Sequence, residues 1–402
     1  MKKEIIFIAG LCAVLMYRYT FSERSVAPGI TLCATCPPGF ELTDSNACKL
    51  RTIYQLYETG RSDEPGVGGL KSPLPALRDG FSPQQIDLGR YLFFDPVLSK
   101  DGTRSCSSCH QPDKGFADGL KTSIGENGTA LKRAAPGLWN VGFSKKFFWD
   151  ARATSLEQQM TGPLYSPAEM ANTPENLLKT LNEIETYRQL FRQAFPDRHR
   201  NNIELQEVYQ AIAAFESSLI SLNSRYDQYA HGYHEALTIE EIEGLNIFRS
   251  FVARCAECHT PPLFTNQQVA VIGLAEPDNK PLDPGAQTTF NDSTLRGAFK
   301  VPSLRNIART APYSHAGRFG TLREMIEFYN LGRGHEVPKG ERLHLHWHIW
   351  EPRLTSYEMD RLVDFLNTLT DESFKPQTPD LLPSGRSSET IKVTLNHNPP
   401  SL

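Results

Sequence analysis

Apolar residues recur at helical spacing through most of the chain after residue 80. The clearest run lies in residues 204–222, where the apolar positions are Leu205, Val208, Ile212, Phe215, Leu219 and Leu222. This spacing puts one apolar face on a helix, so we expect a long helix here and another amphipathic helix over residues 357–369. The alternation typical of strands is almost absent. The chain is therefore predicted to be mostly α-helical.

Four expected helix starts carry a hydroxyl residue three positions before a glutamate or glutamine. The pairs are Ser82 with Gln85, Thr238 with Glu241, Thr321 with Glu324, and Thr355 with Glu358. Each member of such a capping box bonds the backbone N–H of the other, which satisfies donors that the first helical turn leaves free. These positions are predicted as helix N-termini. We expect one domain over residues 81–222 and a second over residues 223–374.

The N-terminus begins Met1-Lys2-Lys3 and continues with an apolar run over residues 5–17. Basic residues before a short apolar core are typical of an export signal, and the run is short for a membrane span. We predict a signal peptide in residues 1–27. Because no clean cleavage site follows, an uncleaved membrane tether through residues 5–17 is the alternative. Either interpretation places the bulk of the protein in the periplasm.

Residues 28–80 are expected to form a cysteine-containing loop and a Gly/Pro-rich linker. Cys33, Cys36 and Cys48 lie in this stretch, and three thiols allow one disulfide and one free thiol, with the pairing left open. A reactive thiol or a third metal site is the alternative. Residues 375–402 are rich in Pro, Ser and Thr and lack periodicity, which predicts a flexible tail.

The length of 402 residues allows two ordinary domains, and the formal net charge is −4. That balance lacks the basic excess of nucleic-acid-binding proteins, so no nucleic-acid partner is expected.

The strongest chemical signal is C-x-x-C-H, which occurs at Cys106, Cys109 and His110 and again at Cys255, Cys258 and His259. Two thiols three residues apart face the same side of a helical turn, which suits thioether bonds to the two vinyl groups of one porphyrin. The following histidine can bind the iron. Zinc or dithiol redox chemistry would need further ligands or a thioredoxin-like pattern, and neither is evident. The sequence predicts two covalently attached haem c groups.

A haem that only carries electrons needs a ligand on each face, whereas chemistry needs an open face. No histidine lies between His110 and His199, which leaves Met160 and Met170 as the strong-field candidates in the first domain. Glu169 could move the proton that peroxide cleavage requires, with Gln159 positioning the peroxide. Taken alone, such residues are more often solvated surface side chains.

The chain resembles the bacterial di-haem cytochrome c peroxidases and, more closely, the MauG enzymes. The resemblance covers roughly residues 80–372 and rests on both CxxCH motifs and on the segments FFWDARATSLEQQMTGPLYSPAEM and FKVPSLRNIARTAPYSHAGRFGTLREMIEFYNLG. It implies two cytochrome-c-like haem domains packed around an inter-haem interface. It also implies site roles: Trp149 between the haems, Gln159, Pro163 and Glu169 in the peroxide pocket, and His110 and His259 as proximal ligands.

Two departures from the peroxidase pattern affect the iron ligands. Many peroxidases carry a displaceable histidine sixteen residues after the first motif, where this chain has Glu126, so we expect an open first haem. They also place a methionine ligand fourteen residues after the position of His315, where this chain has Tyr329. A tyrosinate is a hard donor that favours oxidised iron. Tyr329 could instead be a core residue, with Met325 as the ligand.

The third departure concerns a calcium ion that the family holds between its domains. Thr310 and Pro312 match the carbonyl donors, whereas Ala134 replaces the matching asparagine. The resemblance thus implies one calcium ion whose ligand set has lost a member.

Residues 344–350 have no family counterpart that we can place. His344, His346 and His348 alternate with Leu345, Trp347 and Ile349, so an extended segment would put the imidazoles on one side. An exposed loop is expected, with a surface metal site or a partner contact as the alternatives.

These observations predict a MauG-like di-haem peroxidase. It would react with hydrogen peroxide at the first haem and oxidise a protein partner or a small donor through the second. One alternative is a conventional cytochrome c peroxidase that takes electrons from a small cytochrome or copper protein. The other alternative is a non-catalytic di-haem electron-transfer cytochrome.

Overall fold

The computed structural model describes residues 29–52, 54, 74–198 and 200–386. Residues from Thr31 onward cluster into one compact unit. The boundary predicted at residues 222–223 therefore stays a prediction. The predicted signal or anchor in residues 1–27 and most of the linker lie outside the described residues. Within the described ranges, no helix is long and apolar enough to cross a membrane.

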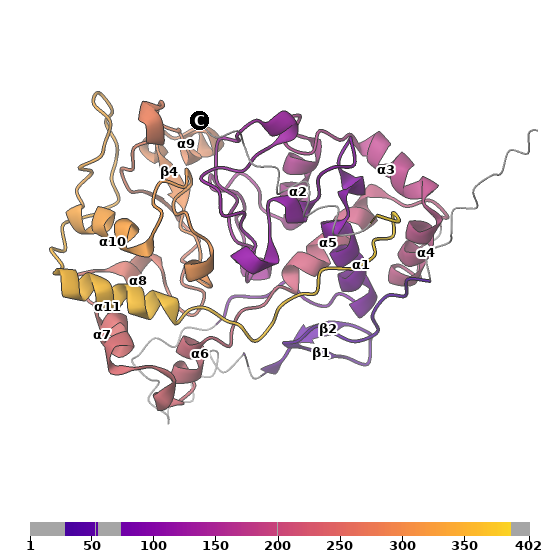
Figure 1. Ribbon diagram of the computed structural model, residues 1–402, viewed down its shortest axis with the longest axis horizontal. Helices are drawn as coiled ribbons and strands as arrows, with labels where there is room; N and C mark the ends of the chain where they lie inside the picture. The colour runs from indigo at the N-terminus through magenta and orange to yellow at the C-terminus, as the bar shows by residue number, and fades with distance from the viewer. Residues whose placement is uncertain (1–28, 53, 55–73, 199, 387–402) are drawn as a thin grey trace, which may run out of the picture. The chain divides into compact units, whose positions relative to one another are not determined.

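The unit is mostly helical, as the sequence predicts (Figure 1). The α-helices are α1 (Pro83–Phe94), α2 (Leu156–Tyr165), α3 (Pro174–Glu183), α4 (Glu185–Ala194), α5 (Leu205–Ser217), α6 (Arg225–Ala230), α7 (Ile239–Phe248), α8 (Cys255–Cys258), α9 (Ala286–Phe290), α10 (Leu322–Leu331) and α11 (Ser356–Asn367). Four short strands form two antiparallel pairs: β1 (Phe40–Leu42) with β2 (Cys48–Leu50), and β3 (Val269–Val271) with β4 (Ala298–Lys300).

All four predicted capping boxes are present, at the starts of α1, α7, α10 and α11. The helix predicted over residues 204–222 ends at Ser217. Beyond it, the Ser218 hydroxyl donates to Phe215 O at 2.7 Å, and the Asn140 side chain bonds both the N–H and the C=O of Ser221. These side-chain bonds compete with helical backbone bonds, so the chain leaves the helix although its apolar positions remain buried.

Two helix pairs are built alike, α1 with α5 and α7 with α11. A Cβ on Gly89 in α1 would lie 1.8 Å from Ala211 O in α5, and one on Gly244 in α7 would lie 1.9 Å from Arg361 O in α11. Both contacts are far below van der Waals distance, so only glycine permits either crossing. In the chain, α1 precedes the first CxxCH motif and α5 follows it, and α7 and α11 flank the second motif in the same way.

A second structural repeat follows each motif. Residues 133–153 and 299–319 share the pattern P-x-L-x-N, at Pro136 and Pro302 in turn. Asn140 and Asn306 both adopt left-handed backbone conformations, with φ of 60° and 58°. An isolated bridge joins Phe147 to Ala153 in the first copy and Tyr313 to Phe319 in the second.

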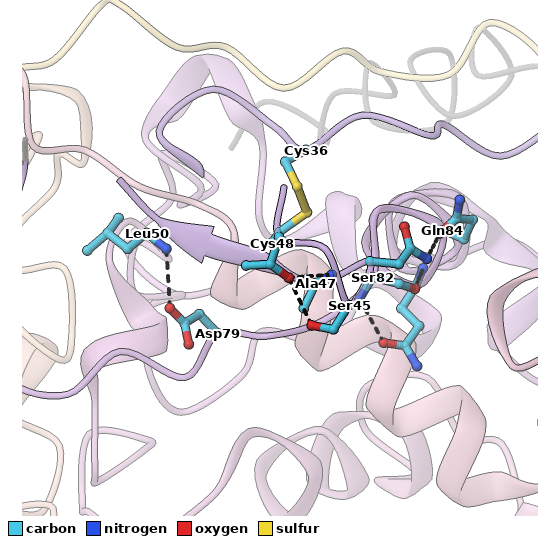
Figure 2. Close-up of a disulfide and its surroundings, with 11 residues drawn as sticks. Cys36, Ser45, Ala47, Cys48, Leu50, Asp79, Ser82 and Gln84 are labelled. Carbon is cyan, nitrogen blue, oxygen red and sulfur yellow. Dashed lines mark hydrogen bonds between the residues drawn. A yellow bond between two sulfur atoms is a disulfide. The ribbon is translucent and has the colours of Figure 1, made fainter. Parts of the chain in front are cut away.

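The cysteine-containing loop is fastened to the helical unit. Cys36 and Cys48 form a disulfide at the start of β2 (Figure 2). Cys33 is free and exposed. One pair with one free thiol is the predicted arrangement. The Cys33 N–H donates to Asp87 of α1 at 2.9 Å, and the Leu50 N–H of β2 donates to Asp79 at 3.2 Å.

The predicted flexible tail is wrong for residues 375–386. Leu382 is fully buried in a cluster with Phe93, Phe94, Phe116 and Phe215. The Ser384 N–H donates to Asp95, and the Arg386 guanidinium donates to Gly102 O. Leu382 therefore helps to anchor a segment whose composition alone suggested mobility. Residues 387–402 lie outside the described residues.

Candidate active site and haem cavity

Both CxxCH motifs line one continuous cavity of about 1360 Å³. A pocket for a single drug-sized ligand has about 300–1,000 Å³, so this cavity exceeds the usual space for one. Its wall includes Cys106, Cys109 and His110 from the first motif and Cys255, Cys258 and His259 from the second. The six residues predicted to hold two haem groups therefore open onto a common space.

The two motif histidines are held in the same way. His110 Nδ1 lies 2.8 Å from Phe116 O, and His259 Nδ1 lies 3.1 Å from Phe264 O. Both phenylalanines are fully buried, with φ of 62° and 54°. An Nδ1–H that donates to a carbonyl fixes the tautomer in which Nε2 is free to bind a metal. Desolvation lowers the pKa of His110, and that of His259 to about 4, so both imidazoles are neutral near pH 7.

The four motif cysteines are protonated thiols. Burial raises the pKa of Cys109 to about 11 and that of Cys255 to about 12, and it also raises the pKa of Cys106 and Cys258. A zinc site or a reactive dithiol needs stabilised thiolates. The cavity instead suits thiols that end as neutral thioethers.

Lys300, which the sequence analysis missed, adds a cation to this cavity wall. Desolvation lowers its pKa to about 8, and among the described residues no carboxylate pairs with its ammonium group. A haem bears two propionate carboxylates that could supply the missing counter-charge. Free imidazole nitrogens, protonated thiols and an unpaired lysine together fit bound haem.

The predicted peroxide-pocket residues lie in the same cavity as His110. Gln159 and Pro163 are on α2, whose N-terminus is capped by Ser155, and Glu169 follows that helix. Desolvation in the cavity wall raises the pKa of Glu169. Met160 and Met170 are buried and also line the cavity. The fold thus brings together the groups that sequence reasoning selected.

Glu126 does not line the cavity, whereas its neighbour Gly125 does. The Glu126 N–H donates to Ala168 O at 2.8 Å, and a Cβ on Gly125 would lie 1.9 Å from the same oxygen. The loop backbone is therefore pressed against the residue before Glu169.

Trp149 and His315 meet where the two structural repeats face each other. The Lys300 N–H donates to Trp149 O, and the Ala134 N–H donates to His315 O, each at 2.7 Å. The two rings are 6.5 Å apart, and the Trp149 indole N–H donates to Ala134 O at 2.9 Å. Equivalent positions of the two repeats thus contact each other reciprocally, as in an isologous interface.

Tyr329 on α10 lines the cavity together with Cys255 and Cys258. Desolvation, with smaller contributions from the two cysteines, raises the pKa of its phenol. No described residue makes a hydrogen bond to its hydroxyl. Met325, one turn earlier, also lines the cavity and packs against the core. Both candidate ligands therefore line the cavity, and the Tyr329 phenol lies close enough to Cys255 and Cys258 to feel their charge.

The histidine-rich segment is only partly the exposed loop that we predicted. His344 is exposed, but His346 and His348 are half-buried and line the cavity. Ligand atoms of His346, His348 and Cys258 lie within 4.8 Å of one another, the one such potential metal-binding group in the described part of the chain. A thioether at Cys258 would remove its sulfur from such a group and leave the two imidazoles as its remaining members.

Glu216 on α5 is a second residue that the sequence gave no reason to select. It is buried and lines the cavity, and one of its carboxylate oxygens has no partner among the described residues. Desolvation raises its pKa to about 8. On a helix that is otherwise amphipathic, a glutamate resembles an ordinary solvated position, so no sequence pattern could single it out.

Comparisons with known proteins agree with this site. A family model described as di-haem cytochrome c peroxidase matches residues 83–235. The chain is 32% identical over 330 residues to cytochrome c551 peroxidase of Nitrosomonas europaea, covering 80% of this chain and 91% of that protein. It is 33% identical over 300 residues to methylamine utilization protein MauG of Methylorubrum extorquens, covering 75% and 82%.

A solved structure of a MauG-like protein associated with microbial copper homeostasis has a TM-score of 0.68 and 32% identity to this chain. The match covers 80% of this chain and 99% of that one. The chain therefore belongs to the di-haem cytochrome c peroxidase family, a family of haem peroxidases that carry two haem c groups and act on hydrogen peroxide.

Proposed function

We propose that this chain is a MauG-like di-haem peroxidase. It reacts with hydrogen peroxide at the site of His110 and oxidises a protein partner or a small donor through the site of His259. The observation that carries the proposal is Tyr329, whose unpartnered hydroxyl faces the second motif in place of a thioether. When bound, haem supplies the electron exchange with peroxide, and the protein supplies positioning and protons.

Glu169 is the proposed proton carrier. Peroxide cleavage moves a proton from one peroxide oxygen to the other, so that H₂O₂ with two protons and two electrons leaves as two waters. The raised pKa of Glu169 brings its carboxyl closer to the range in which it can accept and return a proton. The Gln159 amide can donate a hydrogen bond that holds peroxide beside this carboxyl.

Trp149 is the proposed connection between the two sites, since its carbonyl and indole bond residues of both repeats. On the far side, Trp347 is 73% exposed, and its ring centroid lies 3.6 Å from that of His348 in a tilted contact. A ligand atom of His348 lies within 4.8 Å of the Cys258 sulfur. An exposed indole this close to the second motif supports electron withdrawal from a donor at that surface. Covalent haem c and the Cys36–Cys48 disulfide support a periplasmic location.

The test is the mid-point potential of the second haem in Tyr329→Met, with Tyr329→Phe as the control. A phenolate ligand predicts a low potential, which methionine should raise because a thioether favours the ferrous state. Phenylalanine removes the ligand without supplying another, so its spectrum should differ from both. Each change keeps an apolar side chain beside Met325, so gross unfolding is not expected. Unchanged potentials in both variants would place Tyr329 in the core only.

The second candidate function is a conventional cytochrome c peroxidase, and Met325 favours it because its thioether faces the same cavity. Met325→Leu separates the two proposals. If Met325 binds the iron, this variant shifts the potential and the Tyr329 variants do not. The non-catalytic carrier would require a sixth ligand at the first haem, and Met160→Leu and Met170→Leu test that.

A further inference from the structure

We propose that the guanidinium of Arg133, rather than a calcium ion, is the cation that joins the two repeats and positions Trp149 for transfer between the haem sites. The inference rests on the proposed function only where the experiment measures transfer from the first haem to the second. We call the contacts of Arg133 with Asp150 and Asp283 the Arg133 bridge.

The Arg133 bridge ties the first repeat to Asp283, which lies in the second half of the chain ahead of the second repeat. Arg133 Nε and Nη2 donate to the two carboxylate oxygens of Asp283 at 2.8 and 2.9 Å, and Nη1 donates to Asp150 at 2.7 Å. The exposed fractions of the three side chains are 20%, 15% and 11%. A bidentate arginine–carboxylate pair is among the strongest and most directional polar contacts. Little solvent is present to weaken it.

The same arginine contacts the aromatic side chains of the interface. Its guanidinium lies 5.4 Å from the Phe299 ring, and Phe299 stacks on His315 at 3.7 Å. Arg133 and Phe299 occupy equivalent positions in the two repeats, so this contact joins the repeats at a matched pair. The next residue, Ala134, accepts the Trp149 indole N–H and donates to His315 O. Displacing Arg133 would therefore displace the carbonyl that orients Trp149.

The donor set that remains for calcium does not fit the ion. Calcium takes six to eight oxygen ligands, usually with carboxylates among them. Thr310 and Pro312 offer main-chain carbonyls, but Ala134 has no side-chain oxygen and its carbonyl accepts the indole N–H. The nearby acids are occupied as well, because Asp150 and Asp283 bind Arg133 and Glu276 bonds His315 at 2.8 Å. The positive charge that a calcium ion would supply to these acids is supplied by the Arg133 guanidinium.

The first test is calcium dependence of the holoprotein. Dialysis against EGTA, followed by added CaCl₂, should change neither the Tm nor the peroxide-induced absorbance change of either haem. A Tm or a second-haem response that EGTA lowers and CaCl₂ restores would overturn the proposal.

The second test compares Arg133→Met with the matched control Arg296→Met. Arg296 also binds a carboxylate bidentately, Glu341, but it contacts only the second half of the chain and does not line the cavity. Arg133→Met leaves Asp283 without its ion pair, whereas Asp150 keeps its contact with Arg152, so the Tm should fall by on the order of 5–10 °C. Arg133→Met/Asp283→Asn removes one stranded charge and keeps the experiment interpretable if the single variant does not fold.

Stopped-flow absorbance distinguishes a positioning role from a structural one. At the first haem, Arg133→Met should react with peroxide at the wild-type rate. Transfer to the second haem should slow by on the order of 10²-fold, the scale of an ångström-sized misplacement. Arg133→Lys, which keeps the charge but not the fork, should fall between. Wild-type transfer in Arg133→Met would refute the positioning role. If the wild-type second haem never responds, the proposed function fails, and the EGTA and Tm measurements still decide the bridge.

Discussion

Glu169→Gln tests the peroxide site most directly. The substitution preserves the size of the side chain but removes its ability to accept and return a proton. A positioned acid–base group contributes typically 10²–10⁴-fold, so the reaction with peroxide should slow by about that factor. In activation free energy this corresponds to about 3–5 kcal/mol. Both haems should remain attached, because the CxxCH cysteines, and not Glu169, form the thioether bonds.

The pH dependence gives a second measure of the same residue. Acting first as a base, Glu169 must be ionised, so the rate should fall as the pH drops through its pKa. Desolvation raises that pKa above the ordinary 4.5, and hydrogen bonding from Ser166 and the charge of Arg152 oppose the rise. The acidic fall in rate should therefore begin above the pH at which an exposed glutamate titrates. It should be absent in Glu169→Gln.

The assay is stopped-flow absorbance of the ferric holoprotein mixed with excess hydrogen peroxide between pH 4 and 9. Glu126→Gln is the matched control, because it makes the same chemical change on the adjoining loop at a side chain outside the cavity wall. It should react like the wild type. A wild-type rate in Glu169→Gln, or an equal loss in both variants, would refute the assignment of Glu169.

Three further predictions follow from buried groups, close packing and iron ligation. Burial raises the pKa of Glu216 to about 8 in the folded protein, so this residue destabilises the fold increasingly as the pH rises from about 4.5 to 8. Glu216→Gln should therefore raise the unfolding free energy by several kcal/mol at pH 8 and change it little at pH 4, which denaturant titration would measure. Gly89→Ala should lower stability by about 1–3 kcal/mol or more, because its Cβ would overlap Ala211 O, whereas Gly320→Ala, with Glu324 Oε2 at 3.5 Å as its one near atom, should be tolerated. The electron paramagnetic resonance spectrum of the ferric protein should show one high-spin haem, because the sequence has no histidine between His110 and His199, and a spectrum with low-spin iron alone would contradict this.

Local chemistry explains which features could be predicted. A capping box is formed by residues three positions apart, so Ser82 and Thr321 indicate the starts of their helices without any information on tertiary contacts. The spacing within CxxCH likewise indicates covalent haem attachment from sequence alone. Features set by distant contacts were missed: Leu382 anchors a polar tail against Phe93, and nothing near it in sequence indicates that site. The burial of Glu216 and the unpaired charge of Lys300 also depend on which segments surround them.

The internal repeat has a weak signature in the sequence. Besides the two motifs, P-x-L-x-N occurs at Pro136 and Pro302, and a glycine precedes a phenylalanine by four residues in both α1 and α7. Each pattern is too short to be significant alone. The structure shows that they are equivalent, because both asparagines adopt a left-handed conformation and each glycine packs against a backbone oxygen of its partner helix.

The repeated backbone explains how one half of the interface can differ chemically from the other. The bonds from Lys300 to Trp149 and from Ala134 to His315 are made by main-chain atoms, which every residue except proline provides. Side chains at these positions could therefore diverge without breaking the contact. They have done so at three matched pairs: tryptophan faces histidine, alanine matches lysine, and arginine matches phenylalanine. The tryptophan and the arginine belong to the first repeat and the pocket acid to the segment that follows it, whereas the unpaired lysine belongs to the second repeat and the tyrosine to the helix that follows it. A backbone of reciprocal contacts thus carries side chains that differ from one half to the other, as the proposed transfer between a peroxide site and a donor site requires.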